Sequence, residues 1–191
     1  CSDREADPVA QEYLRAGYHA FVLRYSVGWE NAVWPNPLED YDQAMELIAA
    51  HAKEWHLIPE KIAVIGFSAG GHLAACAATM AKHRPAAAIL AYPVILEGLA
   101  AICAKGAPGA DKAVDSQTCP CFIAATGTDT TVSAMNSLRF VEALYENGIS
   151  AELHLYAFGP HGFSTARTSI ADPAELCSRT LHWVEDSISW L

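Results

Sequence analysis

Basic residues, cysteines and long apolar runs are all scarce in this chain of 191 residues. Lys and Arg number 12 against 22 Asp and Glu, which leaves a formal charge of −10. This charge excludes an electrostatic hold on nucleic-acid phosphates or anionic lipid as the main function. The longest apolar runs, such as residues 85–96, are shorter than the roughly 20 residues that span a bilayer. We therefore expect neither a nucleic-acid partner nor a membrane partner.

Six cysteines are too few for a scaffold held by disulfides. Cys76 lies in an apolar, helix-like stretch where a reduced thiol packs as a small hydrophobic group, which predicts a reducing, cytoplasmic location. Cys119 and Cys121 have no second pair or nearby histidine at ligand spacing, so we interpret them as the start of a strand and expect no metal and no cofactor. The chain begins with Cys1 and shows no basic and apolar leader. Processing or truncation would explain that start, and an export signal ahead of it stays open.

Apolar residues are abundant at 52% of the chain, enough for one sizeable core and a single domain over residues 1–191. Short apolar runs alternate with helix-type stretches, a pattern typical of an α/β fold with a mostly parallel sheet flanked by helices. Strands are expected at residues 19–25, 61–65, 86–92, 121–126 and 151–157. Helices are expected at residues 9–16, 38–55, 69–82 and 133–147, and from residue 173 onward. We interpret the irregular stretch 97–118 as a loop or a small cap over a site.

A serine in the sequence Gly-Phe-Ser-Ala-Gly-Gly lies between one expected strand and the helix that follows it. A serine presented on a sharp turn needs small residues two positions before and after it, and Gly66 and Gly70 supply that clearance around Ser68. The backbone N–H of Ala69, at the start of the helix, would stabilise an oxyanion. The alternative is that Ser68 only caps the helix. The strand before it and the helix after it favour a nucleophile.

A serine hydroxyl needs a base and an orienting carboxylate to act as a nucleophile. Asp129 follows the expected strand at 121–126, where a parallel sheet displays functional groups. Its alternative role is a carboxylate at the start of the next helix, whereas Asp111 and Asp115 follow no strand. His161 lies in a Gly-Pro-His-Gly loop after the last strand, and Ser, Asp and His in this order are typical of groups that follow successive strands. Other histidines are interpreted as structural or solvated: His51, His56, His72, His154 and His182.

Seven stretches of the sequence carry a family resemblance: SDRE at residues 2–5, AGY and FVLRYS up to residue 26, WPNPLED at 34–40, KIAVIGFSAGGHLA at 61–74, AYPVI at 91–95, NSL at 136–138 and GPHGF at 159–163. Through them the chain resembles the α/β-hydrolase esterases, most closely the small bacterial carbohydrate esterases that include acetylxylan esterases and feruloyl esterase-like proteins. The resemblance covers nearly the whole chain. It implies an α/β-hydrolase fold with Ser68 as nucleophile, His161 as general base, Asp129 as orienting acid and Ala69 as oxyanion donor.

In such relatives a strand and a glycine-rich segment precede the SDRE stretch, and this sequence contains neither. The strand would lie in the sheet between those expected at 19–25 and 61–65. We therefore expect a fold that lacks its N-terminal strands, with a gap of about 10 Å, or two strand spacings. Because the glycine-rich segment supplies one oxyanion donor, and losing such a donor costs about 10²- to 10³-fold in rate, we expect a truncated esterase that is weakly active or inactive alone.

The resemblance implies a serine carboxylic ester hydrolase that removes small acyl groups, acetyl first, from a carbohydrate or other small alcohol. Trp29 and Trp34, near the expected mouth of the site, are candidates to stack on a sugar ring, although a large aromatic beside a strand end is more often part of the core. Two alternatives stay open: a serine peptidase or amide hydrolase of the same fold, and a binding protein without catalysis. The expected partners are a small-molecule or oligosaccharide ester and, as a further alternative, a second copy of the chain in a homo-oligomer.

Overall fold

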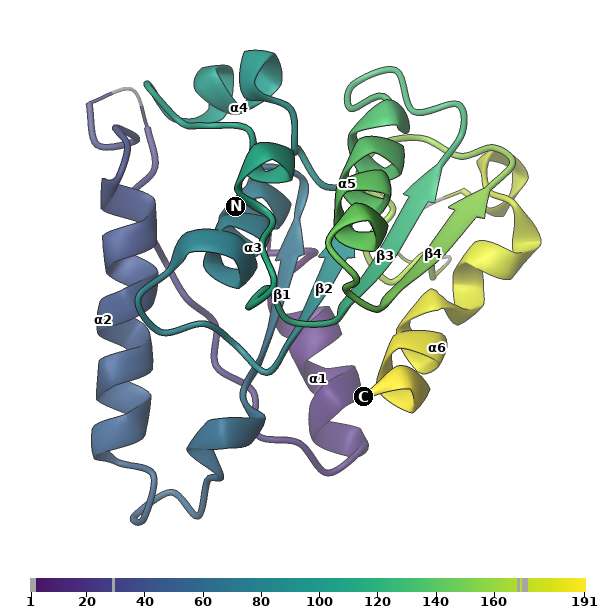
Figure 1. Cartoon of the computed structure of the whole chain (residues 1–191). Coiled ribbons are helices and arrows are strands. Elements are labelled where there is room, and N and C mark those ends of the chain that lie inside the picture. The colour runs from purple at the N-terminus through teal and green to yellow at the C-terminus, as the bar shows by residue number, and fades with distance from the viewer. Residues whose placement is uncertain (1–2, 29, 168, 170–171) are drawn as a thin grey trace.

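The computed structural model describes residues 3–28, 30–167, 169 and 172–191, and its centre is one parallel sheet (Figure 1). The strands lie in the order β1-β2-β3-β4, with β1 at Ala63–Phe67, β2 at Ala87–Ala91, β3 at Cys121–Thr126 and β4 at Ala151–Tyr156. The register aligns Phe67 with Ala91 and Ala91 with Ala124. The carboxyl ends of the strands therefore lie along one edge of the sheet, where loops can bring distant residues together.

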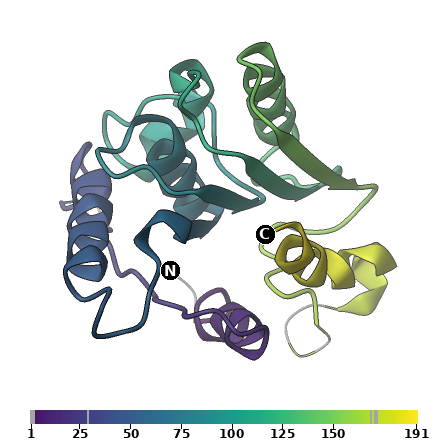
Figure 2. The ribbon, with the colours of Figure 1, turned by 60° about the horizontal axis from the view of Figure 1, so that its bottom comes forward.

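Helices cover both faces of the sheet. They are α1 at Asp7–Arg15, α2 at Asn36–Ala50, α3 at Ser68–Met80, α4 at Glu97–Cys103, α5 at Met135–Glu146 and α6 at Trp183–Trp190. Figure 2 shows α3 and α5 on one face and α1 and α6 on the other, while α2 packs beside α3. This arrangement confirms the expected α/β fold with a parallel sheet flanked by helices.

Two apolar clusters lie between these layers. On one face α3 is buried from Gly71 to Thr79, and its run of alanines lets the helix approach the sheet closely. On the other face Val9 of α1, Phe122 of β3 and Trp183 of α6 share a second cluster. The turn between β1 and α3 is thus held between two tightly packed elements.

The strand expected at residues 19–25 is absent, so this prediction is wrong. Leu23 and Tyr25 pack against the core, whereas Phe21 and Val22 are about half exposed. The segment is extended but joins no ladder, because no strand of the described residues lies along the free edge of β1. A strand needs a partner for its backbone N–H and C=O groups, and an apolar pattern alone does not supply one.

Two helical predictions also need correction. The helix expected at 38–55 ends at Ala50, since residues 51–56 form turns in which the His51 and Trp55 rings stack with centroids 4.6 Å apart. The helix expected from residue 173 consists of short 3-10 turns at Pro173–Glu175 and Ser178–His182, and only then of α6.

Among the described residues, the structure contains no helix with the length and apolar character that crossing a membrane requires.

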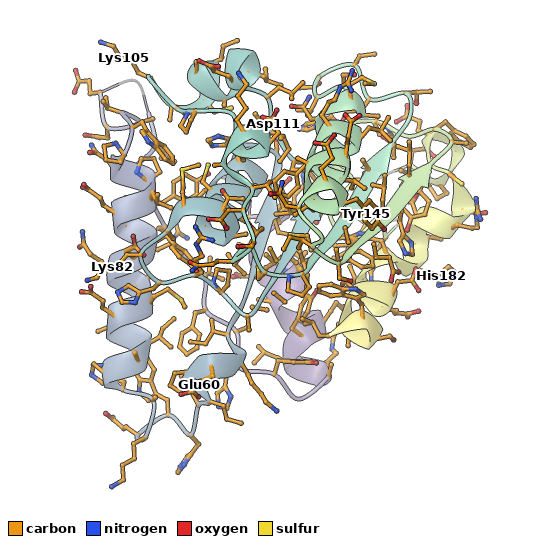
Figure 3. All side chains as sticks on the ribbon, in the orientation of Figure 1. Glu60, Lys82, Lys105, Asp111, Tyr145 and His182 are labelled. Atoms are coloured by element: carbon orange, nitrogen blue, oxygen red, sulfur yellow. The ribbon has the colours of Figure 1, made fainter. Side chains whose placement is uncertain are left out.

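The stretch 97–118 is more regular than expected. It contains α4 and a 3-10 turn at Ala110–Ala113. Figure 3 labels Lys105 and Asp111 in this stretch, and both lie toward the end of the sheet to which the strand arrows point. The part of the stretch around these two residues therefore lies toward the carboxyl edge of the sheet.

Candidate active site

Ser68 lies at the sharp turn between β1 and α3. Its backbone φ is +52°, a left-handed value that is strained for residues other than glycine and that recurs at functional turns. A Cβ on Gly66 would lie 2.2 Å from the carbonyl oxygen of Gly70 and 2.7 Å from the Cβ of Ala74. Gly66 therefore provides the clearance that the sequence predicted.

Gly70 belongs to the same turn but does not have the predicted steric role. Within the described residues a Cβ there would meet the Tyr25 hydroxyl alone, at an ordinary distance of 3.6 Å. The close approach occurs at Gly71, where a Cβ would lie 2.8 Å from the Cβ of Pro93. Because α3 packs against the segment after β2, the requirement for glycine moves by one residue.

Ser68, His161 and Asp129 form a continuous line of hydrogen bonds. His161 Nε2 lies 2.8 Å from Ser68 Oγ, and His161 Nδ1 lies 2.6 Å from Asp129 Oδ2. The three residues follow β1, β4 and β3 respectively, so the carboxyl edge of the sheet brings them together. The structure thus places all three predicted residues in mutual contact.

The carboxylate of Asp129 is fixed from two sides. Its side chain is 1% exposed, and Oδ1 accepts the backbone N–H groups of Thr131 and Val132 at 2.8 and 2.9 Å. Oδ2 then accepts the Nδ1–H of His161. Thr131 and Val132 precede α5, whose start has no side-chain cap, so the alternative role of Asp129 at the start of the next helix is wrong. Its Oδ2 instead orients the imidazole so that Nε2 faces Ser68 Oγ.

The loop that carries His161 is attached to the end of β3 by two threonines. The hydroxyls of Thr126 and Thr128 donate to the carbonyl of Gly159 at 2.8 and 3.2 Å, and the Gly159 N–H donates to Thr128 Oγ1 at 3.0 Å. Gly159 has a φ of +154°, and a Cβ there would lie 2.7 Å from Thr126 Cγ2. This glycine lets the loop begin in close contact with β3.

His72, one turn into α3, does not join the Ser68 line. It is 3% exposed, and its Nε2–H donates to the carbonyl of Pro108 at 2.8 Å. Burial lowers the pKa of His72, so its ring stays neutral near pH 7. His72 links α3 to the stretch 97–118, in agreement with its structural interpretation.

The other histidines bond elsewhere. His154 Nε2 lies 2.7 Å from the carboxylate of Glu152, and His182 Nδ1 lies 3.4 Å from that of Glu185. His51 stacks on Trp55, as described above. These contacts agree with structural or solvated roles.

A cavity of about 70 Å³ lies beside the turn between β1 and α3. The lining residues come from residues 25–37, from α3 and from the stretch 97–118: Tyr25, Ser26, Val27, Gly28, Trp34, Pro37, Ala69, His72, Leu73, Cys103 and Ala104. Ala69 belongs to the first turn of α3, where backbone N–H groups lack a partner within the helix. The predicted oxyanion donor therefore borders this cavity.

Trp34, the predicted substrate contact, lines the cavity and also packs against the core. Its ring lies edge-on to that of His72, with centroids 5.9 Å apart. Both interpretations of Trp34 thus agree with its position. Trp29 lies outside the described residues.

The described residues include no group of three or more His, Cys, Asp or Glu side chains that could hold a metal ion. Cys119 and Cys121 stand at the start of β3, where the Cys121 thiol donates to the Cys119 carbonyl at 3.3 Å. Burial raises the pKa of the Cys76 thiol to about 12, so this group stays protonated at neutral pH. These three cysteines behave as packing residues.

Three residues near His161 were not predicted from the sequence: Tyr92, Arg4 and Glu5. The ring of Tyr92 lies edge-on to the ring of His161, with centroids 5.0 Å apart. Its hydroxyl donates to Glu5 at 2.8 Å. A signal for Tyr92 does exist, since a hydroxyl-bearing aromatic ends an apolar strand and a proline follows it.

A family model described as BD-FAE matches residues 2–96. Among solved structures, an α/β-hydrolase enzyme, MGS-M1, from a Medee basin deep-sea metagenome library is 40% identical, with a TM-score of 0.88, over 100% of this chain and 77% of that chain. An acetyl ester-xyloside bifunctional hydrolase from Caldicellulosiruptor lactoaceticus is 29% identical, with a TM-score of 0.84, over 99% of this chain and 76% of that one.

A curated relative, an acetylxylan esterase from Xylanibacter ruminicola, is 30% identical over 81% of this chain and 36% of its own length. The chain spans about a third of the length of the curated relatives that it matches. The similarity to the solved structures, by contrast, extends over most of both chains.

Proposed function

Because the chain belongs to the α/β-hydrolase family, we propose that it is a serine carboxylic ester hydrolase whose reaction proceeds through an acyl-enzyme. The observation that carries the proposal is the line of hydrogen bonds from Ser68 Oγ through His161 to Asp129, with distances of 2.8 and 2.6 Å. The strained φ of Ser68 and the glycine clearance at Gly66 support it.

The reaction follows from the geometry of these groups. Nε2 of His161 accepts the hydroxyl proton while Oγ of Ser68 attacks the ester carbonyl, and the resulting oxyanion accepts the N–H of Ala69. The imidazolium then protonates the leaving alkoxide, and the alcohol departs as the C–O ester bond breaks. Water, deprotonated by the same histidine, attacks the acyl-Ser68 carbonyl. The acid is released, and the proton returns to Oγ.

The substrate class we propose is a small acyl group, acetyl first, on a sugar or similar alcohol. The cavity beside Ala69 is only about 70 Å³, which suits a short acyl chain better than a long one. Two similar proteins are named as an acetylxylan esterase and an acetyl ester-xyloside hydrolase. Trp34 lies in the wall of this cavity, and we propose that it contacts the sugar part of the substrate.

Hydrolysis of p-nitrophenyl acetate tests the proposal. Ser68→Ala should abolish turnover above the buffer rate, because it removes the hydroxyl that forms the acyl bond in this mechanism. Ser150 is an exposed serine just before β4, so Ser150→Ala is the matched control and should keep full activity. Unchanged turnover in Ser68→Ala would refute the proposal, and hydrolysis of an aminoacyl amide but not of acetyl esters would favour the amide hydrolase.

A further inference from the structure

The second half of the His161 loop has an irregular backbone. Gly162, Ser164 and Ala166 have φ values of +74°, +48° and +57°. Alternating left-handed positions of this kind build no regular ladder or helix, so contacts with side chains elsewhere decide where the loop lies. The position of His161 relative to Ser68 therefore depends on what holds residues 162–166.

Ser164 is the most firmly held residue of this loop. Its N–H donates to the Tyr92 hydroxyl at 3.1 Å, its hydroxyl donates to the carbonyl of Arg4, and its carbonyl accepts Trp183 Nε1–H at 2.7 Å. Arg4 also donates from Nη2 to the carbonyl of Gly162 at 3.3 Å. Every polar group of Ser164 is thus engaged, and the partners come from three separate parts of the chain.

Tyr92 connects these contacts to the imidazole. It follows β2 with a φ of +39° and is 1% exposed. Its ring lies edge-on to His161 at 5.0 Å, while its hydroxyl accepts from Ser164 and donates to Glu5 Oε1 at 2.8 Å. Burial, and next the charge of Glu5, raises the pKa of Tyr92, so the hydroxyl keeps the proton that it donates.

We propose that Glu5 and Tyr92 are positioning residues that hold the His161 loop in line with Ser68. Glu5 fixes the hydroxyl of Tyr92, and Tyr92 then fixes the Ser164 backbone and one edge of the imidazole. The inference rests on the proposed function, because the position of His161 affects turnover only if this ring moves the proton. A displacement of about 1 Å in such a group costs on the order of 10²-fold in rate.

Four variants of the full chain test the pair by hydrolysis of p-nitrophenyl acetate. Tyr92→Phe and Glu5→Ala should each lower kcat by roughly ten- to a hundredfold and leave KM within about twofold. Glu5→Gln keeps an acceptor oxygen for the tyrosine hydroxyl and should restore kcat to within about threefold of wild type. Tyr41→Phe is the matched control. Tyr41 lies on α2, away from the His161 loop, and its hydroxyl donates to the His83 carbonyl at 3.1 Å.

A second measurement does not require turnover. The proton between His161 Nδ1 and Asp129 Oδ2 lies in a short, charge-assisted bond of 2.6 Å, and its low-field NMR signal reports whether the ring is held. The signal should be sharp in wild type and Tyr41→Phe, and broadened or lost in Tyr92→Phe and Glu5→Ala. Turnover that is unchanged in Ser68→Ala would refute the proposed function, and the proton signal would still test the pair.

Two results would overturn the positioning role. The first is wild-type kcat and an unchanged proton signal in Glu5→Ala, whatever Tyr92→Phe does. The second is a rise in KM at constant kcat, which would mean that these residues affect substrate binding. If Tyr92→Phe fails to fold, Glu5→Ala decides the question, because Glu5 is only partly buried and its loss leaves the core intact.

Discussion

The edge of the sheet that carries the candidate site and the flank formed by residues 18–27 are built very differently. At the edge, Tyr92 and Asp129 are less than a tenth exposed and are bonded to distant segments. On the flank, Phe21 is 52% and Val22 46% exposed, and the segment joins no ladder. The side chains that bond to the Ser68 line and to the His161 loop therefore come from outside residues 18–27.

The two regions meet at the cavity beside Ala69. Tyr25, from the flank, and Trp34 contribute to its wall, and burial raises the pKa of Tyr25, so its hydroxyl stays protonated at neutral pH. The flank therefore contributes to the space beside the nucleophile, while the hydrogen bonds of the site come from the strand ends. Changes in the flank should alter substrate binding more than the proton transfer.

The largest loss of activity is expected for a substitution at the sheet edge, at Asp129. Asp129→Asn should lower kcat for p-nitrophenyl acetate by on the order of 10³- to 10⁴-fold, because an amide no longer favours the tautomer with a proton on Nδ1. Asp186→Asn is the matched control: this carboxylate lies 3.5 Å from His154 Nδ1 and should change kcat by less than about twofold. Equal losses in both variants would contradict the assigned role of Asp129.

Stability should show the next largest difference. Phe122→Ala removes a fully buried ring from β3 and should lower the free energy of unfolding by about 3–5 kcal/mol. Val22→Ser, on the flank, should change it by no more than about 0.5 kcal/mol. Urea denaturation followed by tryptophan fluorescence measures both values. A large loss in Val22→Ser would show that the flank supports the fold as the sheet edge does.

The sequence predicted the candidate site better than the flank, and the reason is physical. Ser68, Asp129 and His161 each follow a run whose apolar pattern is strong, and strand ends in a parallel sheet meet at one edge. The stretch 19–25 has a similar pattern, but whether it forms a strand depends on a neighbour that the pattern does not contain. Four of the five strands expected from local pattern therefore form, whereas the one expected at residues 19–25 does not.

Contacts between distant segments account for the remaining errors and omissions. Position 71, rather than position 70, requires a glycine because Pro93, which follows β2, packs against it. The contact between Glu5 and Tyr92 joins residues 87 positions apart, so no spacing along the sequence predicts it. Such contacts arise from the packing of distant segments, whereas the apolar periods of about 3.6 residues in helices and about 2 in strands predict only local structure.

Labelling with a fluorophosphonate followed by peptide mass spectrometry tests the central claim most directly, because the reagent forms a covalent bond only with an activated serine. We expect one phosphonyl group, on the peptide that contains Ser68, with wild-type labelling in Ser150→Ala and loss of labelling in His161→Ala. A folded wild-type chain that labels at another serine, or that does not label at all, would show that Ser68 is not an activated nucleophile.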